Sequence, residues 1–232
     1  MSDFGEAFAL ALAMLARLDT NLLSIIYLSL WVSLSALAIA TCFGLPAGTA
    51  LAIYRFPGRG VLVLLINAML GLPPVVVGLA AYLLLSRAGP LGSFGLLFTP
   101  GAMVIVQTVL VLPIIAALVH RAMEETWARY GHEFQILGAT RRMAIPELLK
   151  IGQRPVLTAL LAGFGRAISE VGAIIIVGGN IAGLTRTMTT TIVLETSKGN
   201  LALALALGIV LISISIAVNG LAFALAARRY AS

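Results

Sequence analysis

Long stretches without a charged side chain are the feature that most restricts how this chain can fold. Between Thr20 and Tyr54 there is no Asp, Glu, Lys or Arg, and further apolar stretches follow along the chain. A bilayer core about 30 Å thick is crossed by about 20 apolar residues in an α-helix. A helix satisfies its own backbone hydrogen bonds, which lipid cannot do for it. The sequence therefore predicts an all-α integral membrane protein.

Composition agrees with this prediction and argues against other classes of protein. The chain is 60% hydrophobic and 10% charged, with a mean hydropathy of +1.07, whereas about a quarter of the residues in soluble domains are charged. We expect residues 1–232 to form a single transmembrane domain with about five spans. The net charge is +6, but the basic residues are spread over the segments between apolar stretches, which argues against a nucleic-acid partner.

Residues that bind metals or cofactors are scarce. Cys42 is the single cysteine, and both histidines, His120 and His132, lie in the same charged segment. This leaves no thiolate cluster and no histidine pair within the membrane, so we expect no metal site and no cofactor in this chain.

The predicted spans are separated by charged or turn-forming residues. They lie at Leu22–Phe43, 59–87, Leu96–Val119, Val156–Gly183 and Leu201–Ala227. Residues 1–21 are expected to form a short amphipathic helix on the membrane surface. Gly44, Pro46 and Gly48 indicate a kink or an end in the first span, with an extension to Arg55.

The second span contains the proline pair Pro73 and Pro74. Prolines at mid-membrane break the helical hydrogen-bond ladder, and the freed carbonyls need partners from protein or trapped water. We therefore expect this span to face protein rather than lipid, with a simple packing kink as the alternative. No internal repeat is visible, which argues against an inverted-repeat transporter.

The distribution of Lys and Arg predicts the orientation of the chain. With the N-terminus outside, most basic residues fall on the inner side. These inner residues are Arg55, Arg59, Arg121, Arg129, Arg141, Arg142, Lys150, Arg154, Arg228 and Arg229. The outer segments hold Arg17, Arg87, Arg186 and Lys198. The positive-inside rule then favours a multi-pass protein of the cell membrane with its N-terminus outside and its C-terminus in the cytoplasm.

Residues 120–155, here called the charged loop, interrupt the apolar sequence. Apolar residues recur in it at helical spacing, at Met123, Trp127, Tyr130, Phe134 and Leu137. Gly138 and Ala139 follow where a short helix would end, and a second amphipathic piece runs toward Pro146. The pattern predicts two short helices outside the lipid. They would form a docking surface for another protein or a loop that merely connects two spans.

The fourth predicted span carries two charges, Arg166 and Glu170. Their spacing of four places them on one helical face, where they can pair. Arg166 lies roughly 16 Å along the helix from Pro155, near the bilayer centre. A charge there costs at least about 2.5 kcal/mol, so the two residues belong either to a translocation pathway or gate, or to a structural ion pair. Glycines on this segment suit close helix packing or a dimer seam. They are Gly163, Gly165, Gly172, Gly178 and Gly179.

The stretch Asn180–Asn200 is too polar for a span in contact with lipid. It offers one cation and many hydroxyls, at Thr185, Arg186, Thr187, Thr189, Thr190 and Thr191. Such groups can solvate an oxyanion in transit or bond to a partner protein. A solvated loop with incidental threonines is the alternative.

Three patterns together resemble the permease subunit of ABC importers for molybdate and tungstate. They are Gly138-Ala139 with Arg141, RAISEVGA (166–173) and GGNIAGLTRT (178–187). The tungstate branch is closer, through residues 189–199 and the apolar run Leu203–Gly208. The resemblance is strong over residues 133–208 and extends to the rest of the chain in topology.

This resemblance implies a fold, partners and site residues. The fold would be that of a type I ABC importer permease with a cytoplasmic coupling helix in the charged loop. The chain would form a homodimer with an extracytoplasmic binding protein and a separate ABC ATPase subunit, which would carry ATP and Mg²⁺. The coupling residues would be Glu133, Gly138, Ala139, Trp127 and Phe134, and the pathway residues Arg166, Glu170, Asn180, Thr185, Arg186 and Thr187. The usual motif places its glutamate six residues before the glycine, where His132 stands here.

The expected function is therefore that of a permease for an oxyanion, with tungstate first and molybdate as the alternative. No G-x-x-x-x-G-K-[ST] pattern occurs, so the chain is not expected to be the ATPase or another enzyme. Two functions of other classes remain open. A secondary transporter or channel would work without ATP, and a membrane anchor for another complex would transport nothing.

Overall fold

The computed structural model describes residues 5, 8–9, 12–13 and 20–228, and these contain helices and no strand. The elements from residue 20 onward are α2 (Thr20–Ile53), α3 (Arg59–Met69), α4 (Pro74–Leu85), η1 (Gly92–Phe94), α5 (Pro100–Ile136), α6 (Arg141–Ile151), α7 (Gln153–Ile168), α8 (Gly172–Gly178), α9 (Met188–Ser197) and α10 (Leu201–Arg228). This confirms the all-α prediction. Most of the amphipathic helix predicted over residues 1–21 lies outside the described residues.

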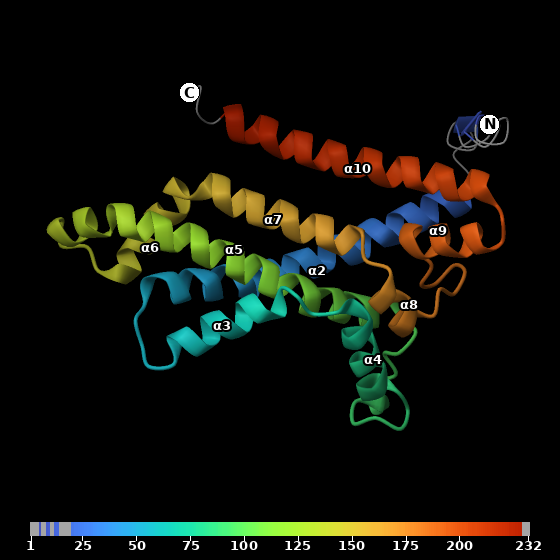
Figure 1. Ribbon diagram of the computed structural model, residues 1–232, viewed down its shortest axis with the longest axis horizontal. Helices are drawn as coiled ribbons and strands as arrows, with labels where there is room; N and C mark the ends of the chain where they lie inside the picture. Colours follow the sequence, from blue (N-terminus) through green and yellow to red (C-terminus); the bar gives the residue numbers. More distant parts are fainter. Residues whose placement is uncertain (1–4, 6–7, 10–11, 14–19, 229–232) are drawn as a thin grey trace.

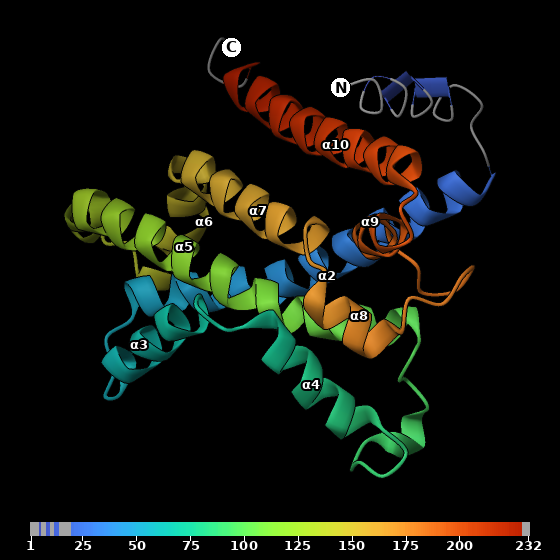
Figure 2. The same ribbon diagram turned by 45° about the vertical axis from the view of Figure 1, so that its right-hand side comes forward.

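Three helices, α2, α5 and α10, are long and apolar enough to cross a membrane. Two further candidate spans are bent pairs, α3 with α4 at 101° and α7 with α8 at 55°. Counting each pair as one span gives up to five, in line with the prediction of about five. Figures 1 and 2 show α2, α5, α7 and α10 running lengthwise through the molecule, while α4 turns away from them.

Helix α2 continues without interruption through Pro46 to Ile53, in line with the predicted extension to Arg55, so the alternative that the helix ends at Gly44, Pro46 and Gly48 is wrong. Gly44 and Gly48 are buried against α5 rather than placed at a break. A Cβ on Gly48 would lie 2.5 Å from the backbone O of Ala116. The small residues therefore allow two long helices to approach closely, as they do at other helix contacts in membranes.

The prolines of the second span do break it, as predicted. Pro73 is extended, with ψ 120°, and Pro74 is the first residue of α4. Helix α3 has no buried residue and α4 buries only Gly78 and Leu85. The described part of the chain therefore covers little of this span.

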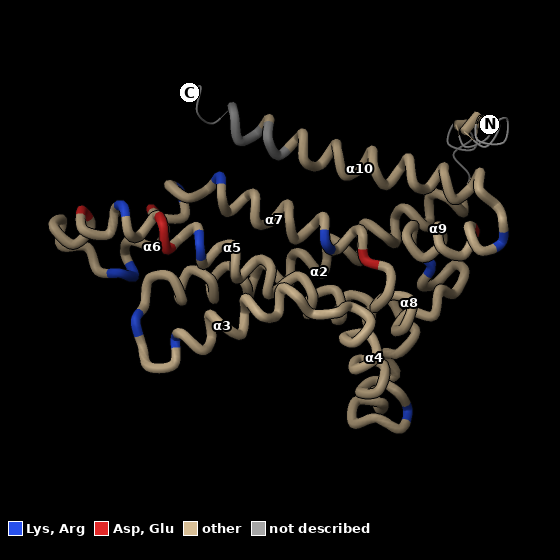
Figure 3. The backbone as a smooth tube through the Cα atoms, in the orientation of Figure 1, with Lys and Arg blue, Asp and Glu red and all other residues tan. Residues whose placement is uncertain are grey.

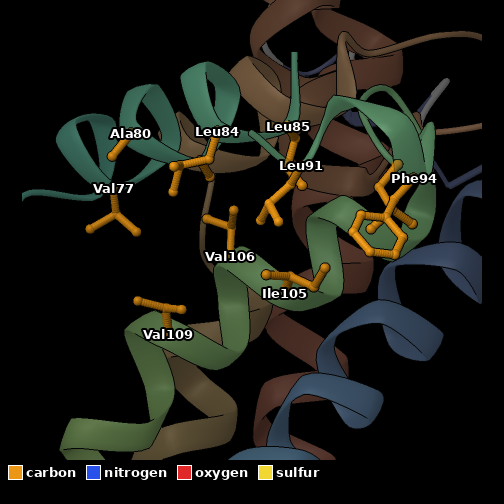
Figure 4. Close-up of a pocket in the computed structure, with 11 residues that line it drawn as sticks. Val77, Ala80, Leu84, Leu85, Leu91, Phe94, Ile105, Val106 and Val109 are labelled. Carbon is orange, nitrogen blue, oxygen red and sulfur yellow. The ribbon is translucent and has the colours of Figure 1, made fainter. Parts of the chain in front are cut away.

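An apolar groove of about 380 Å³ opens between α4, the segment around η1 and α5. Figure 4 shows Leu84, Leu91 and Val106 directed toward it from these three elements. The full lining is Val77, Ala80, Ala81, Leu84, Leu85, Leu91, Phe94, Leu96, Ile105, Val106 and Val109. The lining of the groove is apolar, as is the exposed face of α4.

Helix α5 begins at a Thr99 cap with Pro100 in its first turn. It then runs past the predicted end at Val119 and through the first part of the charged loop to Ile136. The separate short helix predicted there is therefore the last part of a 37-residue helix. The membrane span and the charged loop are connected by one continuous helix.

Close packing on α7 and α8 occurs within the chain. A Cβ on Gly163 would lie 3.1 Å from Val111 and 3.2 Å from Ile115 on α5, and one on Gly178 would lie 3.1 Å from Met103. Only Gly165 of the glycines on α7 has no atom near an added Cβ. The sequence allowed these glycines to form either a dimer seam or close helix contacts. Most of them make close contacts within the chain.

Candidate functional site

The charged loop forms a helical hairpin that turns at Gly138, as predicted. Gly138 has a φ of +72°, a conformation that favours glycine. Its N–H donates to Gln135 O over 3.0 Å, and Ala139 N donates to Phe134 O over 2.9 Å. These two bonds form a Schellman motif, which ends α5. Thr140 then caps α6 by accepting a hydrogen bond from Met143 N.

The predicted apolar face of the charged loop points mostly into the chain itself. Met123 is fully buried, and Trp127 and Phe134 pack against the core cluster that includes Ala144 and Leu148 of α6. These side chains stabilise the hairpin from inside. Trp127 and Phe134 are half-buried, so part of each side chain stays accessible at the surface of the hairpin.

A different apolar group is exposed at the end of the hairpin. Ile136, Leu137 and Met143, here called the apolar tip, are 72%, 80% and 67% exposed. Leu137 belongs to the predicted face, whereas Ile136 and Met143 were missed by sequence reasoning. The signal that could have found them is their position on either side of the Gly138 turn. Glu133 is exposed nearby and Ala139 is half-buried.

Charged residues gather along the hairpin and the neighbouring α2–α3 turn, as Figure 3 shows. Arg59, the first residue of α3, donates from Nη2 to Glu124 Oε1 on α5 over 2.6 Å and from Nε to Leu51 O on α2 over 2.6 Å. Its Nη2 also lies 3.1 Å from His120 Nε2. This network joins α2, α3 and α5 at the base of the charged loop. Periodicity could not predict it, because Arg59 and Glu124 are 65 residues apart.

Arg166 and Glu170 form the predicted pair, with Arg166 Nη1 3.0 Å from Glu170 Oε2. Glu170 lies beyond the end of α7, at the break before α8, rather than inside a continuous helix. Its Oε1 accepts from Ala173 N over 3.1 Å, and its backbone O accepts from Thr189 Oγ1 over 2.8 Å. Glu170 is 3% exposed and Arg166 33% exposed at the side chain. The pair therefore lies at the bend and leaves part of the Arg166 side chain accessible.

The hydroxyls in the first half of the 180–200 segment are buried and hydrogen-bonded within the chain, at Thr185, Thr187, Thr189, Thr190 and Thr191. Thr185 Oγ1 donates to Gly178 O over 2.5 Å, and Thr190 Oγ1 donates to Asn180 Oδ1 over 2.9 Å. Thr187 forms a capping box with Thr190 at the start of α9. The expectation of a solvated loop with incidental threonines is thus wrong, and the hydroxyls are not free donors either.

Arg186 lies next to these threonines and is half-buried. Its Nη2 donates to Asn180 O over 3.4 Å, while its Nε is buried without a hydrogen-bond partner among the described residues. The structure brings Asn180, Thr185 and Thr187 together around this loop. Thr189 connects them to Glu170 at the α7–α8 break.

Glu195 lies at the end of α9, outside the candidate membrane spans. Its Oε1 accepts from Lys198 Nζ over 2.9 Å and its Oε2 accepts from Asn200 Nδ2 over 3.0 Å. These two hydrogen bonds, that from Lys198 first, lower the pKa of the Glu195 carboxyl below its ordinary value. The three residues stabilise the turn between α9 and α10.

Comparison with known proteins identifies the family. No family model matches the chain. It is 42% identical over 187 residues to a probable anion ABC transporter permease protein of Haloferax volcanii, covering 78% of this chain and 81% of that protein. It is 36% identical over 225 residues to the tungstate uptake system permease protein TupB of Peptoclostridium acidaminophilum, covering 97% of this chain and 99% of that protein. The chain belongs to the ABC transporter permease family.

Other members of the family are more distant. A sulfate transport system permease protein CysW of Synechocystis is 29% identical over 181 residues, covering 73% of this chain and 64% of that protein. As an ABC transporter permease, the chain is a multi-pass membrane subunit of a transport system and not itself an enzyme. This agrees with its apolar helices and with the family resemblance of its sequence.

Proposed function

We propose that this permease is the membrane subunit of an ATP-driven importer for tungstate. The observation that carries the proposal is the 36% identity over 97% of the chain to a permease named for tungstate uptake. The lower identity of 29% to a sulfate permease argues against sulfate. Molybdate remains the alternative because it is a tetrahedral dianion of the same charge. Selectivity between the two would lie mostly in a separate extracytoplasmic binding protein.

The charged loop would be the docking site for a separate ABC ATPase subunit, which would hold ATP and Mg²⁺. The exposed apolar tip supports this proposal, because a helix docked into a groove needs protruding apolar side chains. Leu137 would enter a groove on the ATPase subunit. Gly138, Ala139 and Glu133 would lie at the edge of that groove. Trp127 and Phe134 would act indirectly, by holding the hairpin rigid from inside.

The translocation pathway would lie between two copies of this chain, close to the α7–α8 break. The uncovered apolar sides of α3 and α4 support a homodimer, since this chain supplies little cover for them. Glu170 neutralises Arg166 at 3.0 Å, so a net positive charge that favours a dianion would come from Arg186. Asn180, Thr185 and Thr187 would shape the outer end of the pathway by fixing the loop that carries Arg186.

Transport would follow from movement of the two charged loops. ATP binding would close the ATPase dimer, draw the loops together and rock the spans from inward-open to outward-open. Helix α5 would transmit this movement because it extends from the membrane into the loop without a break. Helices α6 and α7, separated only by Gly152, would transmit it to Arg166. This mechanism would require the charged loop to lie in the cytoplasm and the N-terminus outside.

Reconstitution tests the proposal. The permease is co-expressed with an ATPase subunit and a binding protein from the same source, and the complex is placed in liposomes. Tungstate-loaded binding protein should stimulate ATP hydrolysis and uptake. Uptake without ATP would indicate a secondary transporter instead. An intact complex with neither uptake nor stimulation would indicate a membrane anchor.

A further inference from the structure

A small polar cavity lies beside the bend between α7 and α8. Its walls come from α2, α5, α7, α8 and the start of α9, and its polar lining includes Ser29, Ser33, Gln107, Thr187 and Thr189. The space inside it is about 10 Å³. A space of roughly 10–15 Å³ measured in this way is enough for one water molecule.

Gln107 supplies the observation that points to a ligand. Its side chain is 1% exposed, and its Nε2 donates to Ala167 O over 2.8 Å. Because that carbonyl can only accept, the amide cannot be turned round, and its oxygen stays on the other side. Among the described residues no group donates to Gln107 Oε1. A buried acceptor without a donor is unfavourable, so this oxygen calls for a partner.

Two of the four hydroxyls that line the cavity, those of Ser29 and Thr189, donate their hydrogens to backbone carbonyls. Ser29 Oγ donates to Ile25 O over 2.8 Å and accepts from Met188 N over 2.8 Å. Thr189 Oγ1 donates to Glu170 O over 2.8 Å. The cavity is therefore rich in acceptor oxygens. Its occupant must donate a hydrogen bond to Gln107 Oε1.

Water meets this requirement better than an ion does. An anion would face acceptor oxygens, and a buried cation needs a carboxylate or a full shell of oxygen ligands. None of the residues that line the cavity carries a carboxylate, and that of nearby Glu170 is paired with Arg166. We propose that the cavity binds one water molecule, which donates to Gln107 Oε1 and to a hydroxyl oxygen of α2 or α9.

Bound there, the water positions the α7–α8 bend. Gln107 holds the last turn of α7 through the carbonyl of Ala167, and the water fixes the other end of the same amide. It thereby connects α5 with α2 or α9 at the point where the span is broken. Broken helices in membranes need such partners for their freed polar groups.

The direct test is a structure of the whole purified protein in lipid nanodiscs, at a resolution that shows ordered water. Two samples are compared, one in sodium and one in choline buffer. We expect density in both, at hydrogen-bond distance from Gln107 Oε1 and one hydroxyl. Density that appears only with sodium would overturn the proposal in favour of a cation. An empty cavity in both samples would overturn it outright.

A second test uses radicals generated by X-rays from bound water, which label adjacent side chains and are read by mass spectrometry. Val32 and Ile174 line the cavity and are 0% and 2% exposed, so only a bound water should label them. Ser33→Val fills the space with methyl groups and should lower this labelling about fivefold or more by expelling the water. Equal labelling in the wild type and Ser33→Val would contradict the proposal.

The control variant is Thr108→Val on α5. Its hydroxyl donates to Val104 O over 2.8 Å and lies outside the cavity lining, so labelling of Val32 should stay at the wild-type level. Loss of labelling in this variant too would assign the effect to a general change in packing and overturn the water site.

Discussion

At Gly48 a hydrogen atom in place of a side chain sets the distance between α2 and α5. A Cβ there would lie 2.5 Å from the backbone O of Ala116, which has no flexible end to move away. We expect Gly48→Ala to lower the free energy of unfolding by about 1–3 kcal/mol through overpacking. Gly208→Ala on α10 is the control, because no atom lies within 4 Å of the added Cβ. Thermal unfolding of both variants measures the difference, and equal midpoints would contradict the packing role.

The lowered pKa of Glu195 predicts that the stability of the folded chain depends on pH. Because hydrogen bonds from Lys198 and Asn200 lower the pKa of Glu195 in the folded chain, its contribution to stability is complete above the unfolded pKa. That contribution is lost as the pH falls from about the ordinary value of 4.5 through the lower folded pKa. Glu195→Gln should flatten the fall of the unfolding midpoint in this acidic range. Lys198→Met should flatten it in the same direction, and a steeper fall in either variant would argue against the assignment.

Single residues also show which contacts a sequence can predict. The pair Arg166–Glu170 follows from a spacing of four, and the turn at Gly138 follows from the conformational freedom of glycine. The hydrogen bond from Gln107 to Ala167 spans 60 residues, and no local pattern contains it. The sequence shows that Thr185 is polar. Its hydrogen bond to Gly178 O depends on how the loop between α8 and α9 folds back, which the sequence does not show.

At the scale of the elements, the ion pair between Arg166 and Glu170 lies at the break between α7 and α8. Glu170→Gln keeps an acceptor for Ala173 N but leaves the guanidinium of Arg166 without its carboxylate. We expect this variant to lose about 1–3 kcal/mol of stability, a value reduced by the partial exposure of Arg166. The double variant Arg166→Gln with Glu170→Gln should regain most of that stability, as thermal unfolding can measure.

The same double variant distinguishes two roles of Arg166, as a member of a structural ion pair and as a residue of the translocation pathway. If Arg166 contributes to the pathway, as the family resemblance implies, tungstate uptake in reconstituted liposomes stays low although stability returns. Wild-type uptake by the stable double variant would show that the pair only holds the bend. The two measurements are independent, because stability is read from unfolding and function from transport.

Element boundaries were predicted well where backbone chemistry decides them and poorly where tertiary packing does. Pro73 and Pro74 break the second span because proline cannot donate to the ladder. Pro46 does not end α2, which packs closely on α5 on both sides of the proline, at Gly44 and Gly48. Helix α5 continues past the predicted end at Val119 because charge alone does not stop a helix, and it ends where Gly138 provides the turn.

At the scale of the whole molecule, the charged loop and the membrane spans form one mechanical unit. Helix α5 extends through both, and the bonds from Arg59 to Glu124 and Leu51 attach α2 and α3 to it. A force on the hairpin would therefore move several spans together. Amphipathic periodicity located the hairpin, but it could not distinguish the side packed on α6 from the side left exposed.

That distinction gives the last prediction. Leu137 is 80% exposed, so Leu137→Ser should leave the unfolding midpoint unchanged while weakening binding of the ATPase by about 1–3 kcal/mol, as for loss of an interface anchor. Trp127→Ala is the matched contrast, because Trp127 packs against the core and its truncation should lower stability first. Co-purification of the ATPase, together with unfolding of the permease alone, measures both effects. Normal ATPase binding by Leu137→Ser would place the docking surface elsewhere, since no partner could then depend on the most exposed apolar side chain of the hairpin.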